Sequence, residues 1–301
     1  MKKLFEQGDN ALHSLAQTRE KALVDAYKSS LKEVQGFLDQ AWKKYASEGK
    51  LSVNEMSKYN RFQYMETQIA GQLKQLNVKT KKIVRESLRE GATQAYNWTG
   101  YAVEAGTGVN FKFGLIPKAQ IEAAIENEYD KIGWPNRTNE QVKQLNTQVR
   151  QAVTQSMILG ESYENAQKRL TDVMNIGAGK AMRILRTETH RAQVEGRLYG
   201  IDKTLQGAKL LGVRTHKIWV NTKDDRTRDS HQSMGDVKAD KDGLFTLPSG
   251  VKTRGPGLSG VAEEDINCRC TVRLVFPDYK PDYDAMEGMD ASAYGMSCLI
   301  K

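Results

Sequence analysis

The region that decides the fold begins with W-V-N-T-K-D-D-R-T-R-D-S-H (219–231) and ends with E-E-D-I-N-C-R-C-T-V (263–272). Alternating apolar residues indicate strands at 213–221, where the first stretch begins, and at 270–276, where the second ends. The glycines between the two stretches supply turns. The pattern therefore predicts a small, loop-rich β unit, which follows a long part of the chain with helical periodicity.

Most of the metal-binding chemistry of the chain falls in this unit, at His231, Cys268 and Cys270. Cysteines two positions apart on a strand point to the same face and can bind one cation. Cysteine and histidine ligands together favour zinc, and the ion would stabilise a unit with little core of its own. Zinc takes four ligands, and the candidates for the fourth are Asp225, Asp229 and His190. The alternative is that the cysteines are small buried residues beside a network of Arg and Asp side chains.

Charged residues of the first stretch are expected to pair across a turn. Asp225 can reach Arg228, and Asp229 can reach Arg226. Either pair would hold the loop before His231 in shape.

Catalysis has little support in the residues of this region. His231 could act as a general base oriented by Asp225. The chain has no nucleophile motif such as G-x-S-x-G and no phosphate-binding P-loop, and its four histidines are widely scattered. We therefore predict that the protein is not an enzyme. The alternative is a zinc-dependent nuclease or effector that uses His231, Cys268 and Cys270.

The first two thirds of the chain show apolar residues at steps of three and four, which indicate amphipathic helices. Their narrow apolar stripes are typical of helices packed along one another, and short connections favour an antiparallel bundle. The longer predicted helices span 10–47, 52–76, 80–102, 117–129, 139–159 and 181–199, with a short strand or arm at 110–116 and a break at 175–179. The predicted fold class is α+β: a mostly helical N-terminal body (helical bundle), a small loop-rich β unit and a flexible tail.

The net charge of the chain is +8 at pH 7. The last 25 residues contain five acidic and two basic side chains, so the remaining residues carry +11. A net positive charge of this size is typical of proteins that bind nucleic acid. A soluble protein with a solvated basic surface can have the same composition. The densest basic run is K-T-K-K-I-V-R-E-S-L-R, and its candidate phosphate contacts are Lys79, Lys81, Lys82, Arg85 and Arg89. Such a run is more often a solvated helix face.

Targeting and membrane signals are not found in the sequence. No apolar run approaches the roughly 20 residues that a membrane span needs. The N-terminal residues M-K-K-L-F-E-Q-G-D-N lack the apolar core of a secretory signal. We therefore expect a protein made in the cytosol and without a membrane span.

Three motifs in a fixed order resemble the phage Mu F-like minor head protein (phage head morphogenesis) family. They are R-T-E (186–188), W-x-x-x-x-D-D-R-T-R-x-x-H (219–231) and I-N-C-R-C (266–270). The combination is much more specific than any one of them. The residues that match the family pattern are Arg186, Glu188, Trp219, Asp225, Arg228, His231, Asn267, Cys268 and Cys270.

The resemblance implies a minor capsid protein of a tailed phage or prophage. Such a protein associates with the portal and with other capsid or scaffolding proteins, and it affects packaged double-stranded DNA during head assembly and DNA delivery. We would expect it in the head interior of the virion, and in the host cytoplasm during assembly. The expected domains are a helical domain for partner or portal contact (1–133), a Mu F-like domain (134–276) and a flexible acidic tail (277–301).

Overall fold

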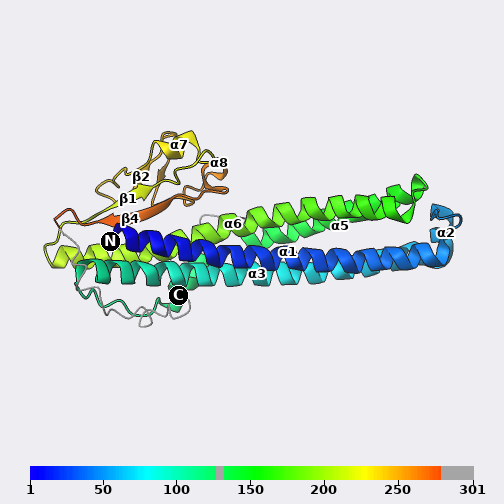
Figure 1. Cartoon of the computed structure of the whole chain (residues 1–301), viewed down its shortest axis with the longest axis horizontal. Coiled ribbons are helices and arrows are strands. Elements are labelled where there is room, and N and C mark those ends of the chain that lie inside the picture. The colour runs from blue at the N-terminus through cyan, green and yellow to red at the C-terminus, as the bar shows by residue number, and fades with distance from the viewer. Residues whose placement is uncertain (127–131, 279–301) are drawn as a thin grey trace. The chain divides into compact units, whose positions relative to one another are not determined.

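A computed structural model describes residues 1–126 and 132–278 (Figure 1). Its helices are α1 Lys2–Tyr45, α2 Val53–Ser57, the 3-10 helix η1 Lys58–Asn60, α3 Arg61–Thr107, α4 Lys118–Glu126, α5 Trp134–Ile158, α6 Tyr163–Leu210, α7 Asp229–Gln232 and α8 Ala262–Asp265. Its strands are β1 His216–Val220, β2 Phe245–Thr246, β3 Lys252–Thr253 and β4 Thr271–Val275. The predicted fold class is confirmed for the helical body and the small β unit. Residues 279–301, most of the predicted tail, lie outside the described part.

The helices are longer than predicted. α3 continues through the expected boundary between 76 and 80, and residues 110–116 form no strand. The predicted break at 175–179 is also wrong, because α6 passes through it. Gly177 lies so close to α5 that a Cβ there would be 2.8 Å from Cδ1 of Leu145. The glycine therefore permits close helix packing and does not end the helix.

Two compact units make up the chain. Unit 1 contains residues 1–18, 85–131 and 186–301, and unit 2 contains residues 19–84 and 132–185. The unit boundaries fall within α1, α3 and α6. The sequence boundary near residue 133 stays a prediction, because the compact units are each assembled from separate stretches.

Unit 2 consists of helices around an apolar core with one buried polar chain. The Tyr27 hydroxyl donates to Oε1 of Gln141 at 3.0 Å, and Nε2 of Gln141 donates to the carbonyl of Gly177 at 3.0 Å. These bonds connect α1, α5 and α6. Burial raises the pKa of Tyr27 to about 12, so the hydroxyl keeps the proton that it donates.

Unit 1 contains the β elements, which pack on helices. β1 and β4 are antiparallel, with His216 opposite Val275 and Val220 opposite Thr271. One apolar core joins side chains of β1 and β4 to the first turns of α1, the end of α3 and the second half of α6 (Figure 1). The loop-rich unit thus shares one core with the helices, which its own sequence did not indicate.

The helices of unit 1 approach each other through small residues. A Cβ at Gly196 of α6 would overlap the carbonyl oxygen of Ala92 in α3 and lie 2.7 Å from its carbonyl carbon. One turn later, a Cβ at Gly200 would lie 2.9 Å from Cγ2 of Thr99. The spacing Gly196–x–x–x–Gly200 therefore sets the distance between α3 and α6.

Arg197 connects three elements of unit 1. Its buried guanidinium donates to Oγ1 of Thr271 at 2.6 Å, at the start of β4, and to the Asp9 carboxylate in α1. Because a buried guanidinium is stable only when its donors have acceptors, this network holds the strand against the helices.

None of the helices in residues 1–126 and 132–278 has the length and apolarity needed to cross a bilayer.

Candidate metal centre

His231 is placed by an ordered loop before the short helix α7. The Asp224 carboxylate accepts two hydrogen bonds from the Arg269 guanidinium, and it accepts a third from the Thr227 hydroxyl at 3.0 Å. The bonds from Arg269 lower the pKa of Asp224. Arg228 is the residue before α7, and its guanidinium donates to the carbonyl of Ile266. The loop before His231 is thus tied to the segment that carries the cysteines.

Cys268 and Cys270 precede β4 and continue its alternation. Residues 268, 270, 272 and 274 are buried, whereas the residues between them are partly or fully exposed. Asn267, directly before the pair, has a φ of 54°, in the left-handed region that Asn tolerates better than most residues. Its backbone N–H donates to the Thr187 hydroxyl of α6 at 3.2 Å. The two cysteines therefore face the same side, as predicted from their spacing.

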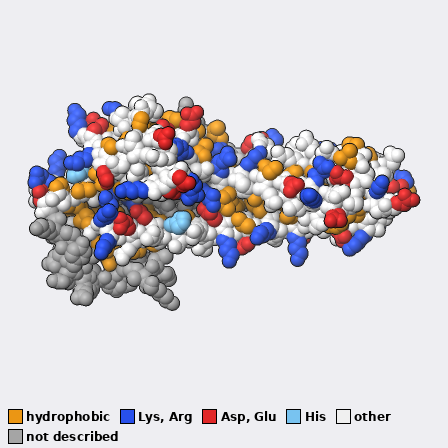
Figure 2. Space-filling model, turned by 45° about the horizontal axis from the view of Figure 1, so that its top comes forward, with side chains coloured by type: hydrophobic (Ala, Val, Ile, Leu, Met, Phe, Trp, Pro, Cys, Tyr) orange, Lys and Arg blue, Asp and Glu red, His pale blue; other side chains and the backbone are white. Residues whose placement is uncertain are grey.

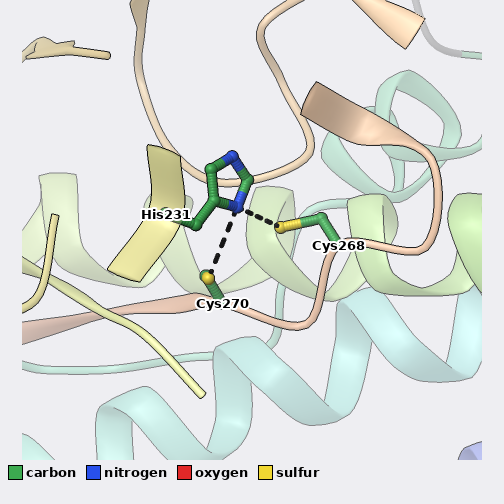
Figure 3. Close-up of side chains that lie close together, drawn as sticks. All are labelled: His231, Cys268 and Cys270. Carbon is green, nitrogen blue, oxygen red and sulfur yellow. Dashed lines mark hydrogen bonds between the residues drawn. The ribbon is translucent and has the colours of Figure 1, made fainter. Parts of the chain in front are cut away.

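His231, Cys268 and Cys270 form a buried group whose ligand atoms all lie within 4.8 Å of one another. Figure 3 shows the imidazole facing both thiols, with Nδ1 at 3.5 Å from Sγ of Cys268 and 3.6 Å from Sγ of Cys270. Zinc, with bonds of about 2.3 Å to sulfur and about 2.0 Å to nitrogen, places tetrahedral ligands about 3.5 Å apart. The group could therefore hold a metal ion.

The electrostatics of the two thiols suit a metal ligand set. A hydrogen bond with Cys268 lowers the pKa of Cys270, and His231 lowers it further. The same sulfur–sulfur interaction and burial raise the pKa of Cys268. One thiolate is therefore favoured in the pair, and the thiolate is the form that binds metals.

The other ring nitrogen of His231 faces a carboxylate. Nε2 lies 3.0 Å from Oε2 of Glu264 in α8, at salt-bridge distance but without the alignment of a hydrogen bond. The Ser230 hydroxyl donates to Oε2 at 3.1 Å, and the Ser249 hydroxyl donates to Oε1 at 3.2 Å. The Trp219 ring packs edge-on against His231 with 5.2 Å between the centroids. The imidazole is thus contacted at both ring nitrogens and by the Trp219 ring.

Buried polar atoms without hydrogen bonds gather around this group. Within the described residues, Nε1 of Trp219 and Nε2 of His190 have no hydrogen-bond partner. His190 lies against Gly257, where a Cβ would be 3.2 Å from its Cδ2. Burial lowers the pKa of His190 to about 4, and the charges of Arg197 and His231 add to this effect.

The predicted site residues have different places in the structure. Asp225 is exposed and lies outside the group of three. Arg186 is exposed on α6, whereas Glu188 is buried and pairs with Arg191 at 2.9 Å. The predicted loop pairs Asp225–Arg228 and Asp229–Arg226 are replaced by pairs of Asp224 with Arg269 and Arg226. The carboxylate one position earlier is used because it faces the segment that carries the cysteines.

Three residues that organise the group were missed by sequence reasoning: Thr187, Asp224 and Glu264. Thr187 is the middle residue of R-T-E, and Asp224 is the first Asp of D-D-R, so both were inside quoted motifs. Glu264 gave no signal, because it is one of three consecutive acidic residues, 263–265, of which only this one faces His231. The alternative interpretation, in which the cysteines are small buried residues beside Arg and Asp side chains, also finds its network in the structure.

Comparison with protein families gives one match. Residues 147–273 match the model of the family described as Phage Mu protein F like protein. This part of the chain is therefore similar to the phage Mu F-like family. The matched region contains all three motifs, and it therefore includes His231, Cys268 and Cys270.

Two curated proteins resemble this chain along most of its length. Minor head protein GP7 of Bacillus phage SPP1 is 29% identical over 271 residues, which cover 90% of this chain and 86% of that protein. NAD(+)–arginine ADP-ribosyltransferase EFV of Enterococcus faecalis (strain ATCC 700802 / V583) is 27% identical over 220 residues. That match covers 72% of this chain and 44% of EFV, so the chain spans less than half of the enzyme's length. A comparison with solved structures found no match.

Proposed function

We propose that this chain is a minor head protein of a tailed phage or prophage, which acts with the portal and packaged DNA in the head. The observation that carries the proposal is the similarity to a minor head protein along 90% of the chain. This similarity includes the long helices as well as the motif region. Capsid or scaffolding proteins are the expected further partners. The location is the head interior in the virion and the host cytoplasm during assembly.

Exposed apolar residues in unit 2 support a protein partner such as the portal. The predicted stripe residues of α1, such as Leu23 and Leu38, are buried within the chain and are not available for contact. The connections between helices are different from the helix stripes, because they expose apolar side chains. Tyr59, between α1 and α3, is 88% exposed, and Leu159, between α5 and α6, is 59% exposed. A bridge between Lys50 and Ser162 joins these two connections. We therefore propose them as the portal contact.

Copurification tests this proposal. We expect the tagged chain to copurify with portal protein from infected or induced cells and to be present in procapsids. Replacing Tyr59 and Leu159 together by Asp should reduce portal recovery, because charges would enter an apolar contact. Leu210→Asp is the matched control, since Leu210 is an equally exposed apolar residue elsewhere. Absence of the wild-type chain from procapsids and virions would contradict the proposed function.

The basic run on α3 supports contact with DNA. Lys79, Lys82, Arg85 and Arg89 are exposed, whereas Lys81 is partly exposed. Arg89 also pairs with Glu122 at 3.3 Å. Figure 2 shows Lys and Arg mixed with Asp and Glu on the visible face, so the net charge is not gathered into one continuous patch there. Contact with a few phosphates is therefore what we propose.

Binding to double-stranded DNA should fall with salt, and the triple variant Lys79→Glu, Lys82→Glu, Arg85→Glu should reduce the salt dependence. Each lost phosphate contact lowers the slope of log K against log salt by about 0.9. Filter binding across salt concentrations measures this slope. The matched control is the triple reversal of Lys21, Lys28 and Lys32, which are exposed on α1 and give the same change in net charge. Equal slopes for both triple variants would contradict a contact at α3.

We further propose that zinc is the ion held by His231, Cys268 and Cys270. The support is the S/N ligand set, its burial and separations of 3.5 and 3.6 Å, which are close to those of tetrahedral zinc ligands. Burial of all three residues favours a structural role over a zinc-dependent nuclease or effector, because a substrate would need access to the ion. The ion would connect α7 to the start of β4.

A further inference from the structure

Glu264 has a position that neither the sequence motifs nor the comparisons assign. It belongs to α8, while His231 and Ser230 belong to α7 and Ser249 follows β2. Its side chain is 12% exposed, and that of His231 is 2% exposed. A carboxylate this close to a buried imidazole restricts which ring nitrogen carries the proton. The nitrogen that faces the carboxylate is favoured as the donor.

We propose that Glu264 is the positioning residue of the metal centre, and this inference rests on the proposed zinc site. Its carboxylate accepts the Nε2 proton of His231, so Nδ1 keeps its lone pair toward the sulfurs of Cys268 and Cys270. A metal-bound histidine generally donates its second N–H to a carboxylate or carbonyl, which fixes the tautomer and strengthens the ligand. The 3.0 Å separation between Nε2 and Oε2 is already within hydrogen-bond distance.

The surroundings of Glu264 hold its carboxylate in place. Ser230 and Ser249 each donate to it, one to each oxygen. The next residue, Asp265, accepts the Ser259 hydroxyl at 2.8 Å and the backbone N–H of Gly260 at 2.8 Å. These bonds fix the start of α8. The carboxylate is therefore fixed before an ion binds, and little ordering is needed on binding.

The same contacts extend the metal centre beyond its ligands. Through Ser249, the orientation of His231 depends on the turn between β2 and β3. Glu263 is the natural comparison, because it carries the same charge one position earlier and is exposed. If zinc affinity depends only on the negative charge of α8, replacing either residue should change the affinity equally. If zinc affinity depends on the orientation of the His231 ring, only the replacement of Glu264 should change it.

The test measures zinc affinity by competition with a chromophoric chelator for the full-length protein. We expect Glu264→Ala to bind zinc about 10–100-fold more weakly than wild type. Glu264→Gln should lose less, because its amide oxygen still accepts the proton. Glu263→Ala should bind as wild type does. The cobalt-substituted Glu264→Ala protein should also show a changed thiolate-to-cobalt absorption band, which a purely structural role would not change.

The outcomes separate this inference from the zinc proposal. Zinc binding by wild type with equal affinity in Glu264→Ala would overturn the role of Glu264 and leave the zinc site intact. A wild-type protein that does not bind zinc would overturn both, but it would leave the proposed role in the phage head. If Glu264→Ala does not fold, Glu264→Leu decides, because its side chain cannot accept the proton, and wild-type affinity and an unchanged cobalt spectrum in that variant would overturn the inference.

Discussion

Gly196→Ala should destabilise the protein by about 3 kcal/mol or more, the largest effect expected of a single added methyl group in this chain. The added Cβ would overlap the carbonyl oxygen of Ala92, and backbone atoms cannot move aside as a flexible side chain can. α3 and α6 would have to separate along the stretch that carries the core of unit 1. Thermal denaturation should show a decrease in Tm of roughly 6–12 °C, at about 2–4 °C per kcal/mol.

Gly179→Ala is the matched control in the same helix. A Cβ there would meet nothing within 4 Å, and the residue is exposed. Because alanine is favoured over glycine in a helix by about 0.8–1.0 kcal/mol, this variant should be slightly more stable than wild type. Similar stabilities for the Gly196 and Gly179 variants would show that α3 and α6 are not packed at the distance described.

One zinc ion per chain is expected in the purified wild-type protein, and Cys268→Ser should remove it. A serine hydroxyl is a poor zinc ligand, and the remaining two residues cannot hold the ion tightly. With free zinc at about 1,000 times Kd, binding stabilises the folded state by about 4 kcal/mol, so a chelator should lower the Tm of wild type. The Tm of the Cys268→Ser variant should not respond to the chelator. Metal analysis and denaturation with and without chelator measure both effects.

Two controls define the ligand set. Cys298→Ser removes a thiol whose residue lies outside the described part of the chain, and it should leave the zinc content unchanged. Asp225→Asn tests the predicted fourth ligand, and the exposure of Asp225 leads us to expect no loss of zinc. A folded, metal-free wild type whose Tm is insensitive to chelator would remove the zinc proposal. The buried cysteines beside the Asp224–Arg269 pair would then be a packing feature.

The sequence was most informative where periodicity is strict. The alternation from Cys268 to Leu274 correctly placed the cysteines on one face, and helical periodicity identified the long helices. Glycine was misread at 175–179, because a glycine that allows two helices to touch looks like one that ends a helix. Only the partner residue, Leu145, separates the two cases, and it lies about 30 residues away in the chain.

The histidine and the cysteines of the candidate site could be chosen from the sequence, whereas the residues that support them could not. His231, Cys268 and Cys270 have side chains whose metal-binding chemistry is specific. Their residue types and spacing were therefore enough to group them as one candidate site. Glu264 and Asp224 are ordinary acidic residues among several. Their roles depend on which of two or three neighbouring carboxylates faces inward. For Glu264 this is determined by the four-residue helix α8, and for Asp224 by the loop before α7.

The shared core of unit 1 has a consequence for synthesis on the ribosome. Leu4 and Phe5 pack in the same core as Val272 and Leu274. At about 5–20 residues per second, roughly 13–54 s pass between the synthesis of these two ends of the core. During that interval the apolar face of the first turns of α1 lacks the partners that β4 supplies. Unit 2 contains no residue beyond 185 and can fold first, whereas the core of unit 1 needs β4.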